Sequence, residues 1–125
     1  MTKSVLITQC LQRDFVAPIA PGEALPNLLH IGHVESQRLM GEGGNNPVAR
    51  IVRWAEQQPE NTIQFIHIRD WHDETDLHQQ PHLAQFGRHC IANTPGAEFV
   101  FEHTSGTDHH IINSTTLNDL SLIHI

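Results

Sequence analysis

The sequence predicts an α/β fold, a three-layer doubly wound parallel sheet, from two strand-like segments and the helix between them. Residues 4–9 and 61–68 are apolar and rich in β-branched side chains, without regular alternation of apolar and polar residues. That pattern is typical of strands buried on both faces, as in a parallel sheet. A strand, a helix and a second strand joined by long connections form a βαβ unit, from which doubly wound folds are built.

The predicted helix covers residues 46–58. Asn46 can cap its amino end, and Pro47 suits the first turn, where a missing N–H group costs nothing. Pro59 ends it. Four apolar residues share one face, at the spacing expected of a helix that lies on a sheet: Val48, Ile51, Val52 and Ala55.

The rest of the chain gives weaker signals. Residues 98–103 are a third candidate strand, and residues 17–46 indicate a loop rich in Pro and Gly with one short helix near 33–40. The last six residues, 120–125, match the translation of the end of a transposon adapter used in sequencing libraries. We therefore expect 1–119 to be the domain portion and 120–125 a non-native read-through tail; the alternative is a natural apolar strand.

Composition limits the functional classes. A chain of 125 residues is long enough for one domain. Its formal net charge of −7, with seven Lys and Arg together, argues against a nucleic-acid partner. The two cysteines do not form a disulfide framework, no signal peptide is recognisable, and no apolar run approaches the length of a membrane span. We expect a cytoplasmic protein without a membrane partner.

Histidine is the most informative residue type. The chain has eleven, most of them between His67 and His110, and imidazole is the commonest metal ligand in proteins. In an open α/β sheet, ligands bind outside the carboxyl ends of the strands, where the second predicted strand ends. Beyond that strand, Asp70, His72, His78 and His89 place one carboxylate and three imidazoles within a span of twenty residues.

Three blocks, in order along the chain, resemble the N-terminal part of an isochorismatase-like hydrolase, the superfamily that includes the nicotinamidases. Residues 5–15 resemble a strand followed by the family's D-x-Q-N-D-F motif, residues 65–72 its next strand and R-D-W-H, and residues 89–99 its H-C-x-x-G-T-P-G-A-x-F. The resemblance implies that the chain supplies about the first half of the fold. It also implies a small-molecule ligand, hydrolysis of a small amide or a related C–N or ether bond, and a homo-oligomer in the full-length protein.

In the nicotinamidase branch of the family, one Asp and three His bind a divalent cation that orients the ring nitrogen of the substrate. The matching positions here are Asp70, His72, His78 and His89, so the resemblance implies a site for Zn²⁺, with Fe²⁺ or Mn²⁺ as alternatives. Two other interpretations stay open. His82 could replace His78, or these residues could form structural hydrogen bonds and hold no metal.

The family's catalytic triad of Asp, Lys and a nucleophilic Cys is not matched. Cys10 occupies the position of the catalytic Asp, where we favour a buried core thiol over a redox or nucleophilic role. Lys3 is the only lysine, so none follows the third strand. The nucleophile would lie beyond residue 125, since Cys90 aligns with the cysteine beside the metal-binding His. We expect an inactive hydrolase fragment; the alternatives are a degenerate binding or scaffold domain, and metal storage or sensing.

Overall fold

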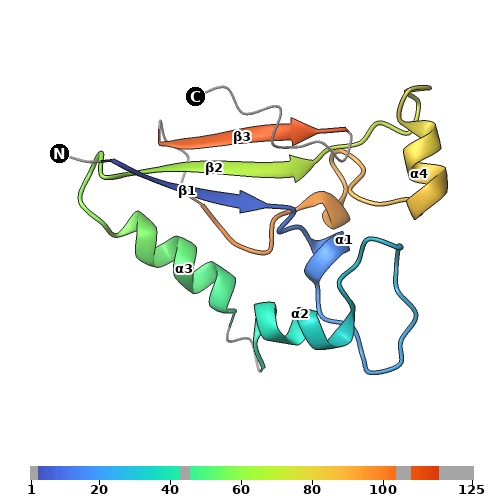
Figure 1. The fold of residues 1–125 in the computed structure, drawn as a ribbon, viewed down its shortest axis with the longest axis horizontal. Helices are drawn as coiled ribbons and strands as arrows, with labels where there is room; N and C mark the ends of the chain where they lie inside the picture. Colours follow the sequence, from blue (N-terminus) through green and yellow to red (C-terminus); the bar gives the residue numbers. More distant parts are fainter. Residues whose placement is uncertain (1–2, 43–45, 104–107, 116–125) are drawn as a thin grey trace.

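A three-stranded parallel sheet organises the computed structural model, which describes residues 3–42, 46–103 and 108–115. The strands are β1 (Ser4–Gln9), β2 (Ile63–Asp70) and β3 (His109–Ser114), in the order β1-β2-β3 (Figure 1). Both strand pairs are parallel. The predicted α/β class with a parallel sheet is therefore confirmed.

The first two strands were predicted and the third was placed wrongly. β1 has the predicted bounds, and β2 begins two residues later than expected and runs to Asp70. Residues 98–103 do not form a strand; apart from one isolated bridge between Phe99 and Gln12, they are irregular. Their aromatic residues pack instead of pairing, because Phe101 is buried in a cluster with Val48 and Val52. The segment was predicted as a strand because it is rich in aromatic residues, but these residues pack in the core.

The predicted βαβ unit is present. Helix α3 (Pro47–Glu56) connects β1 to β2, and the Asn46 side chain caps it by accepting a hydrogen bond of 3.0 Å from the Ala49 N–H. Three of the four residues expected on its apolar face are buried: Val48, Val52 and Ala55. Ile51 is 56% exposed, so that part of the prediction is wrong. Ile51 is not among the residues that pack against the cluster of Val48, Val52 and Phe101.

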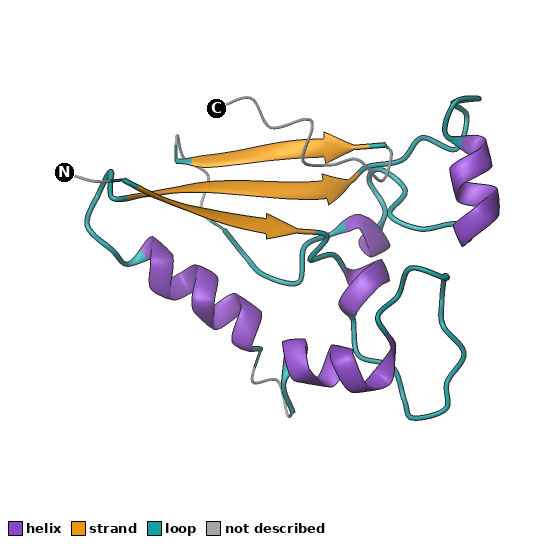
Figure 2. Ribbon diagram, in the orientation of Figure 1, coloured by secondary structure: helices purple, strands orange, loops and turns teal. Residues whose placement is uncertain are grey.

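Four further short elements complete the described fold: α1 (Arg13–Val16), α2 (Gly32–Met40), α4 (Gln80–Phe86) and the 3₁₀ turn η1 (Pro95–Ala97). Of these, only α2 was predicted. Figure 2 shows α2 and α3 on the same side of the sheet, so the described residues supply one of the two helical layers of a three-layer fold. The carboxyl ends of the strands point toward α1, η1 and α4 (Figure 1).

Strand β1 is less buried than its composition predicts. Val5 is 45% exposed and Ile7 is 46% exposed, whereas Ile68 of β2 is fully buried. The difference follows from position, because β1 forms one edge of the sheet and, among the described residues, pairs with β2 alone. Residues 120–125, the predicted read-through tail, lie outside the described residues. Within the described part of the chain, no helix is long and apolar enough to cross a membrane.

Candidate metal centre

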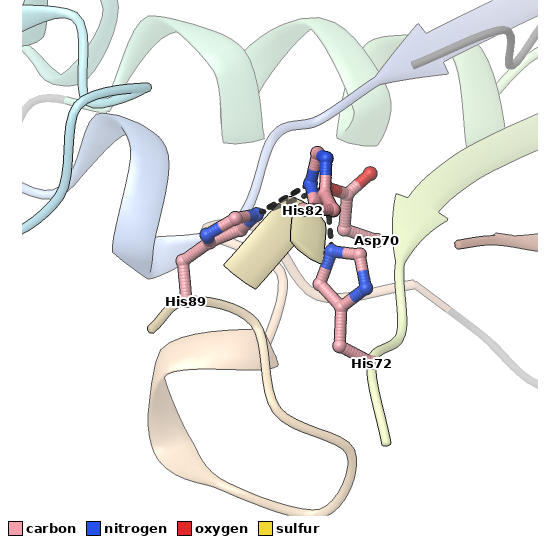
Figure 3. A group of neighbouring side chains, drawn as sticks. All are labelled: Asp70, His72, His82 and His89. Atoms are coloured by element: carbon pink, nitrogen blue, oxygen red, sulfur yellow. Dashed lines mark hydrogen bonds and ion pairs between the residues drawn. The ribbon is translucent and has the colours of Figure 1, made fainter. Parts of the chain in front are cut away.

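Four potential ligands meet where β2 ends. One ligand atom from each lies within 4.8 Å of the others, and the group consists of Asp70, His72, His82 and His89. Figure 3 shows the three imidazole rings arranged around the Asp70 carboxylate. Asp70 is the last residue of β2, His82 lies on α4, and His89 follows that helix. The ligand atoms thus come from the end of β2 and from the segment that follows it, which contains α4 and returns to the end of the strand.

The cluster contains three of the four predicted ligands, and His78 is not among them. His78 is exposed in the turn before α4, where its backbone N–H donates to Asp76 Oδ1 at 2.9 Å. His82 lies four residues further on, inside α4, and its Nε2 is 3.3 Å from His89 Nε2. The structure therefore does not bring His78 to the cluster and brings His82 there instead, which was the alternative. Sequence spacing could not decide between them, because the start of α4 was not predicted.

Gln12 fixes the backbone of Asp70. Its side-chain amide donates to the Asp70 carbonyl at 2.7 Å and accepts from the Asp70 N–H at 2.9 Å, and it also donates to the Ala97 carbonyl at 2.9 Å. Gln12 is fully buried, so water does not compete for these bonds. The last residue of β2 is thereby held from two sides. In this chain, the Gln of the first block therefore holds the end of β2 in place.

The hydrogen bonds of His72 determine which of its nitrogens faces the cluster. Gln79 Nε2 donates to the Asp76 carboxylate at 2.8 Å, so Gln79 Oε1 is the atom 3.1 Å from His72 Nδ1. The Asp73 N–H also donates to this Oε1, which confirms that it is the oxygen. His72 Nδ1 must therefore carry a proton. The other nitrogen, Nε2, lies 3.1 Å from Asp70 Oδ2.

His89 is oriented in the same way by the backbone. Its Nδ1 is 2.6 Å from the Gly87 carbonyl, which can only accept, so Nδ1 donates. Its Nε2 then faces Asp70 Oδ2 at 3.5 Å. The next residue, Cys90, donates its backbone N–H to Asp14 Oδ2 at 2.7 Å. Asp14, a non-catalytic member of the first motif, thus anchors the turn that carries His89.

Burial and mutual contact shift the ionisation of this group. Burial would raise the pKa of Asp70, but hydrogen bonds from His72 and His89 and their charges outweigh it and lower that pKa below its usual value. Burial would likewise lower the pKa of His89, but Asp70 and the Gly87 carbonyl raise it. Asp70 therefore stays a carboxylate at neutral pH, facing ring nitrogens that carry lone pairs whenever the imidazoles are neutral.

Neither cysteine nor the lysine belongs to the ligand group. Cys10 follows β1, has a backbone φ of 58°, and packs partly buried against the cluster that contains Cys90. Cys90 is fully buried, and burial together with the charge of Asp70 raises the pKa of its thiol. Lys3 precedes β1, at the amino end of the strands, whereas Asp70 lies at the carboxyl end of β2. The chain's only lysine is therefore at the opposite edge of the sheet.

Comparison with known proteins supports the fold. No protein-family model and no curated protein matches the sequence. Several solved structures do match, among them an isochorismatase-like hydrolase and a pyrazinamidase. An isochorismatase-like hydrolase from Alkaliphilus metalliredigens aligns with a TM-score of 0.62 and 19% identity, over 91% of this chain and 53% of that one. The pyrazinamidase of Pyrococcus horikoshii in complex with zinc aligns with a TM-score of 0.59 and 29% identity, over 94% of this chain and 54% of that one.

The chain has the fold of an isochorismatase-like hydrolase. It spans about half the length of the two solved structures. The likeness to the Alkaliphilus protein shows the fold. The pyrazinamidase, which has the higher sequence identity to this chain, is a protein whose structure was solved in complex with zinc. This chain has a His and Asp cluster that could bind a metal ion at the carboxyl edge of its sheet.

Proposed function

We propose that Asp70, His72, His82 and His89 hold one divalent cation in an isochorismatase-like hydrolase domain. The observation that carries the proposal is the direction of the lone pairs. His72 donates its Nδ1 proton to Gln79, and His89 donates its Nδ1 proton to the Gly87 carbonyl. Both Nε2 atoms then face the same oxygen of Asp70. Neutral imidazoles and a carboxylate arranged like this repel one another, unless a positive charge lies among them.

Either a proton shared with Asp70 or a metal ion would supply this positive charge. Protonation is the simpler one, and it competes with metal because ligating imidazoles must be neutral. A structural ion pair, however, needs one imidazolium beside the carboxylate. Here a third imidazole, His82, places its Nε2 3.3 Å from that of His89. Three ring nitrogens and one carboxylate oxygen match the ligands and the coordination number that Zn²⁺ prefers, and Fe²⁺ or Mn²⁺ would need further ligands to complete their shells.

Calorimetric titration of the full-length protein with Zn²⁺ tests the proposal. We expect one equivalent to bind, and we expect Asp70→Ala and His89→Ala to weaken binding strongly, since each removes a buried ligand. His78→Ala is the matched control, because it removes an exposed histidine of the same segment and should bind as the parent does. Equal binding by the parent, Asp70→Ala and His89→Ala would overturn the proposal and leave these residues as a structural hydrogen-bond network.

For the reaction, we propose the family's class of substrate, a small molecule with an amide or a related C–N or ether bond. A cation held by the cluster would supply a Lewis-acid contact for a nitrogen or oxygen atom of that molecule. The residues of this chain would contribute the binding and orientation of the ligand at the carboxyl edge of the sheet. They do not supply the family's proton acceptor, because Cys10 occupies that position. They do not supply its lysine either, because the only lysine, Lys3, lies at the amino end of the strands.

The second candidate is therefore a binding domain that keeps the cation and the fold without ordinary turnover. A specific observation favours it: Cys10 is partly buried and packs against the apolar cluster that contains Cys90. With an ordinary pKa of about 8.5, a thiol is mostly protonated at neutral pH and cannot accept a proton, whereas a carboxylate is ionised there and can. Equilibrium binding of nicotinamide to the zinc-loaded protein, measured beside ammonia release, distinguishes the two. Binding without release supports the binding domain, and release supports the hydrolase.

A further inference from the structure

We infer that Gln79 is a positioning residue that fixes the ring orientation and the tautomer of His72, and that Asp76 in turn fixes the amide of Gln79. The inference deepens the proposed cation site and rests on it. It assigns a role to two residues outside the ligand cluster, neither of which the resemblance to the family marks. Its evidence is one chain of hydrogen bonds, from the Asp76 carboxylate through the Gln79 amide to His72 Nδ1.

The chain of bonds has one polarity only. A carboxylate oxygen accepts and cannot donate, so Asp76 Oδ2 requires the NH₂ group of Gln79. The oxygen of the same amide is then turned to His72 Nδ1, at 3.1 Å, and to the Asp73 N–H, also at 3.1 Å. An amide flip would place NH₂ against an N–H donor and carbonyl oxygen against a carboxylate. Asp76 and the Asp73 backbone therefore select the orientation of Gln79, and Gln79 selects the His72 tautomer.

The position of Gln79 in the chain supports a role other than helix capping. It is the residue directly before α4, where Ser, Thr, Asp and Asn are preferred because their short side chains cap the helix. The Gln79 side chain makes no capping bond. It is 7% exposed and turns back to His72, which is fully buried. A polar side chain buried at this location is used on the imidazole.

The consequence for a bound cation follows from general metal-site chemistry. A ligating histidine usually donates its other ring N–H to an acceptor that sets ring orientation and keeps the ligating nitrogen unprotonated. Gln79 is that acceptor for His72, as the Gly87 carbonyl is for His89. Loss of such an outer partner typically weakens metal affinity by about 10- to 100-fold. The acceptor for His72 is a side chain, whereas the acceptor for His89 is a backbone carbonyl. A substitution can therefore remove the acceptor for His72.

The test compares zinc affinity, measured against a competing chelator, among four forms of the full-length protein. Gln79→Leu keeps the approximate size of the side chain and removes the acceptor; we expect weakening of about 10- to 100-fold. Gln85→Leu is the matched control, since it changes an exposed glutamine on the same helix, and we expect no change. The double variant Gln79→Glu with Asp76→Asn reverses the donor and acceptor between positions 76 and 79 and restores an acceptor for His72. We expect it to recover most of the lost affinity.

A second readout does not depend on affinity. In the zinc-loaded parent, the His72 Nδ1 proton should give an observable, exchange-protected signal in ¹⁵N-labelled protein, and this signal should be lost in Gln79→Leu and return in the double variant. Parent-like affinity and an unchanged signal in Gln79→Leu would overturn the inference while the cation site stands. Failure of the parent itself to bind zinc would overturn the proposed function instead, so the two failures are distinguishable. A Gln79→Leu loss that the double variant does not recover would also overturn the inference, because it would show a packing effect.

Discussion

Acid should destabilise the protein through His67, a histidine outside the candidate metal cluster. His67 is fully buried on β2 and joins the three strands and α3 in one chain of hydrogen bonds. Its Nδ1 is 2.7 Å from the Thr8 hydroxyl, its Nε2 is 2.9 Å from His109 Nδ1, and His109 Nε2 is 3.2 Å from Glu56 Oε2. Because Glu56 accepts from His109, the whole chain is satisfied with both rings neutral. An added proton on His67 would place two donors against each other, or remove the acceptor for Thr8.

The structure gives the size and sign of the effect. Burial, then the neighbouring His109 and His103, lower the pKa of His67 from 6.5 to about 4, against a smaller opposing effect of Glu56. The unfolded chain therefore binds more protons than the folded one between these values, and stability falls as the pH falls through that window. The full difference corresponds to about 3 kcal/mol, of which about 2 kcal/mol is lost between about pH 7.5 and about pH 5.

Urea unfolding of the full-length protein at these two pH values, with a chelator present, measures the effect. His67→Phe is the control, since it keeps an aromatic ring among Phe65, Phe99 and Phe101 but cannot titrate. The variant should be less stable at about pH 7.5, where Thr8 and His109 lose their partner, and it should lose about 2 kcal/mol less than the parent on acidification. Equal losses by parent and variant would refute the reasoning.

Three further predictions follow from other parts of the structure. Gly96→Ala should destabilise the fold by about 1–3 kcal/mol in chemical unfolding, because the new Cβ would collide with the Asp14 carboxylate that holds the Cys90 N–H; unchanged stability would contradict this. The full-length protein should release no ammonia from nicotinamide at an ordinary rate, since the loss of a positioned base typically removes about 10²- to 10⁴-fold. Activity gained only in Cys10→Asp would support that account, and ordinary turnover by the parent would refute it. Residues 1–119 alone should associate rather than unfold cooperatively, because β1 is an edge strand that carries the exposed apolar side chains of Val5 and Ile7; a sharp, reversible thermal transition of a monomer would contradict this.

The sequence predicted the elements whose signals are local. β1, β2 and α3 were found from apolar runs and from the Asn46–Pro47 start of the helix, since these patterns depend on each segment's own residues. Residues 98–103 misled because aromatic residues favour strands and core contacts alike. Which role they take is decided by Val48 and Val52, about fifty residues away in the chain, against which Phe101 packs. Pairing partners of that kind cannot be recognised from one segment.

The candidate site was predicted in the same uneven way. Asp70 and His72 could be placed because they lie at and just after the end of a strand, and His89 because it opens a recognisable block. The choice between His78 and His82 depends on where α4 begins, and that short helix has no buried residue to mark an apolar face. Gln79 gave no signal, because a buried amide has the same appearance in a sequence as an exposed one.

The central claim is that three imidazoles and one carboxylate hold the cation, and zinc-edge X-ray absorption of the full-length protein loaded with one equivalent of Zn²⁺ tests it most directly. Nitrogen and oxygen scatterers at about 2.0–2.1 Å, with the outer-shell signature of about three imidazoles, are predicted. His82→Ala should reduce that signature by about one imidazole, and His78→Ala should leave it unchanged. A sulfur scatterer at about 2.3 Å, which would indicate Cys10 or Cys90 as a ligand, or a spectrum altered by His78→Ala and not by His82→Ala, would contradict the account.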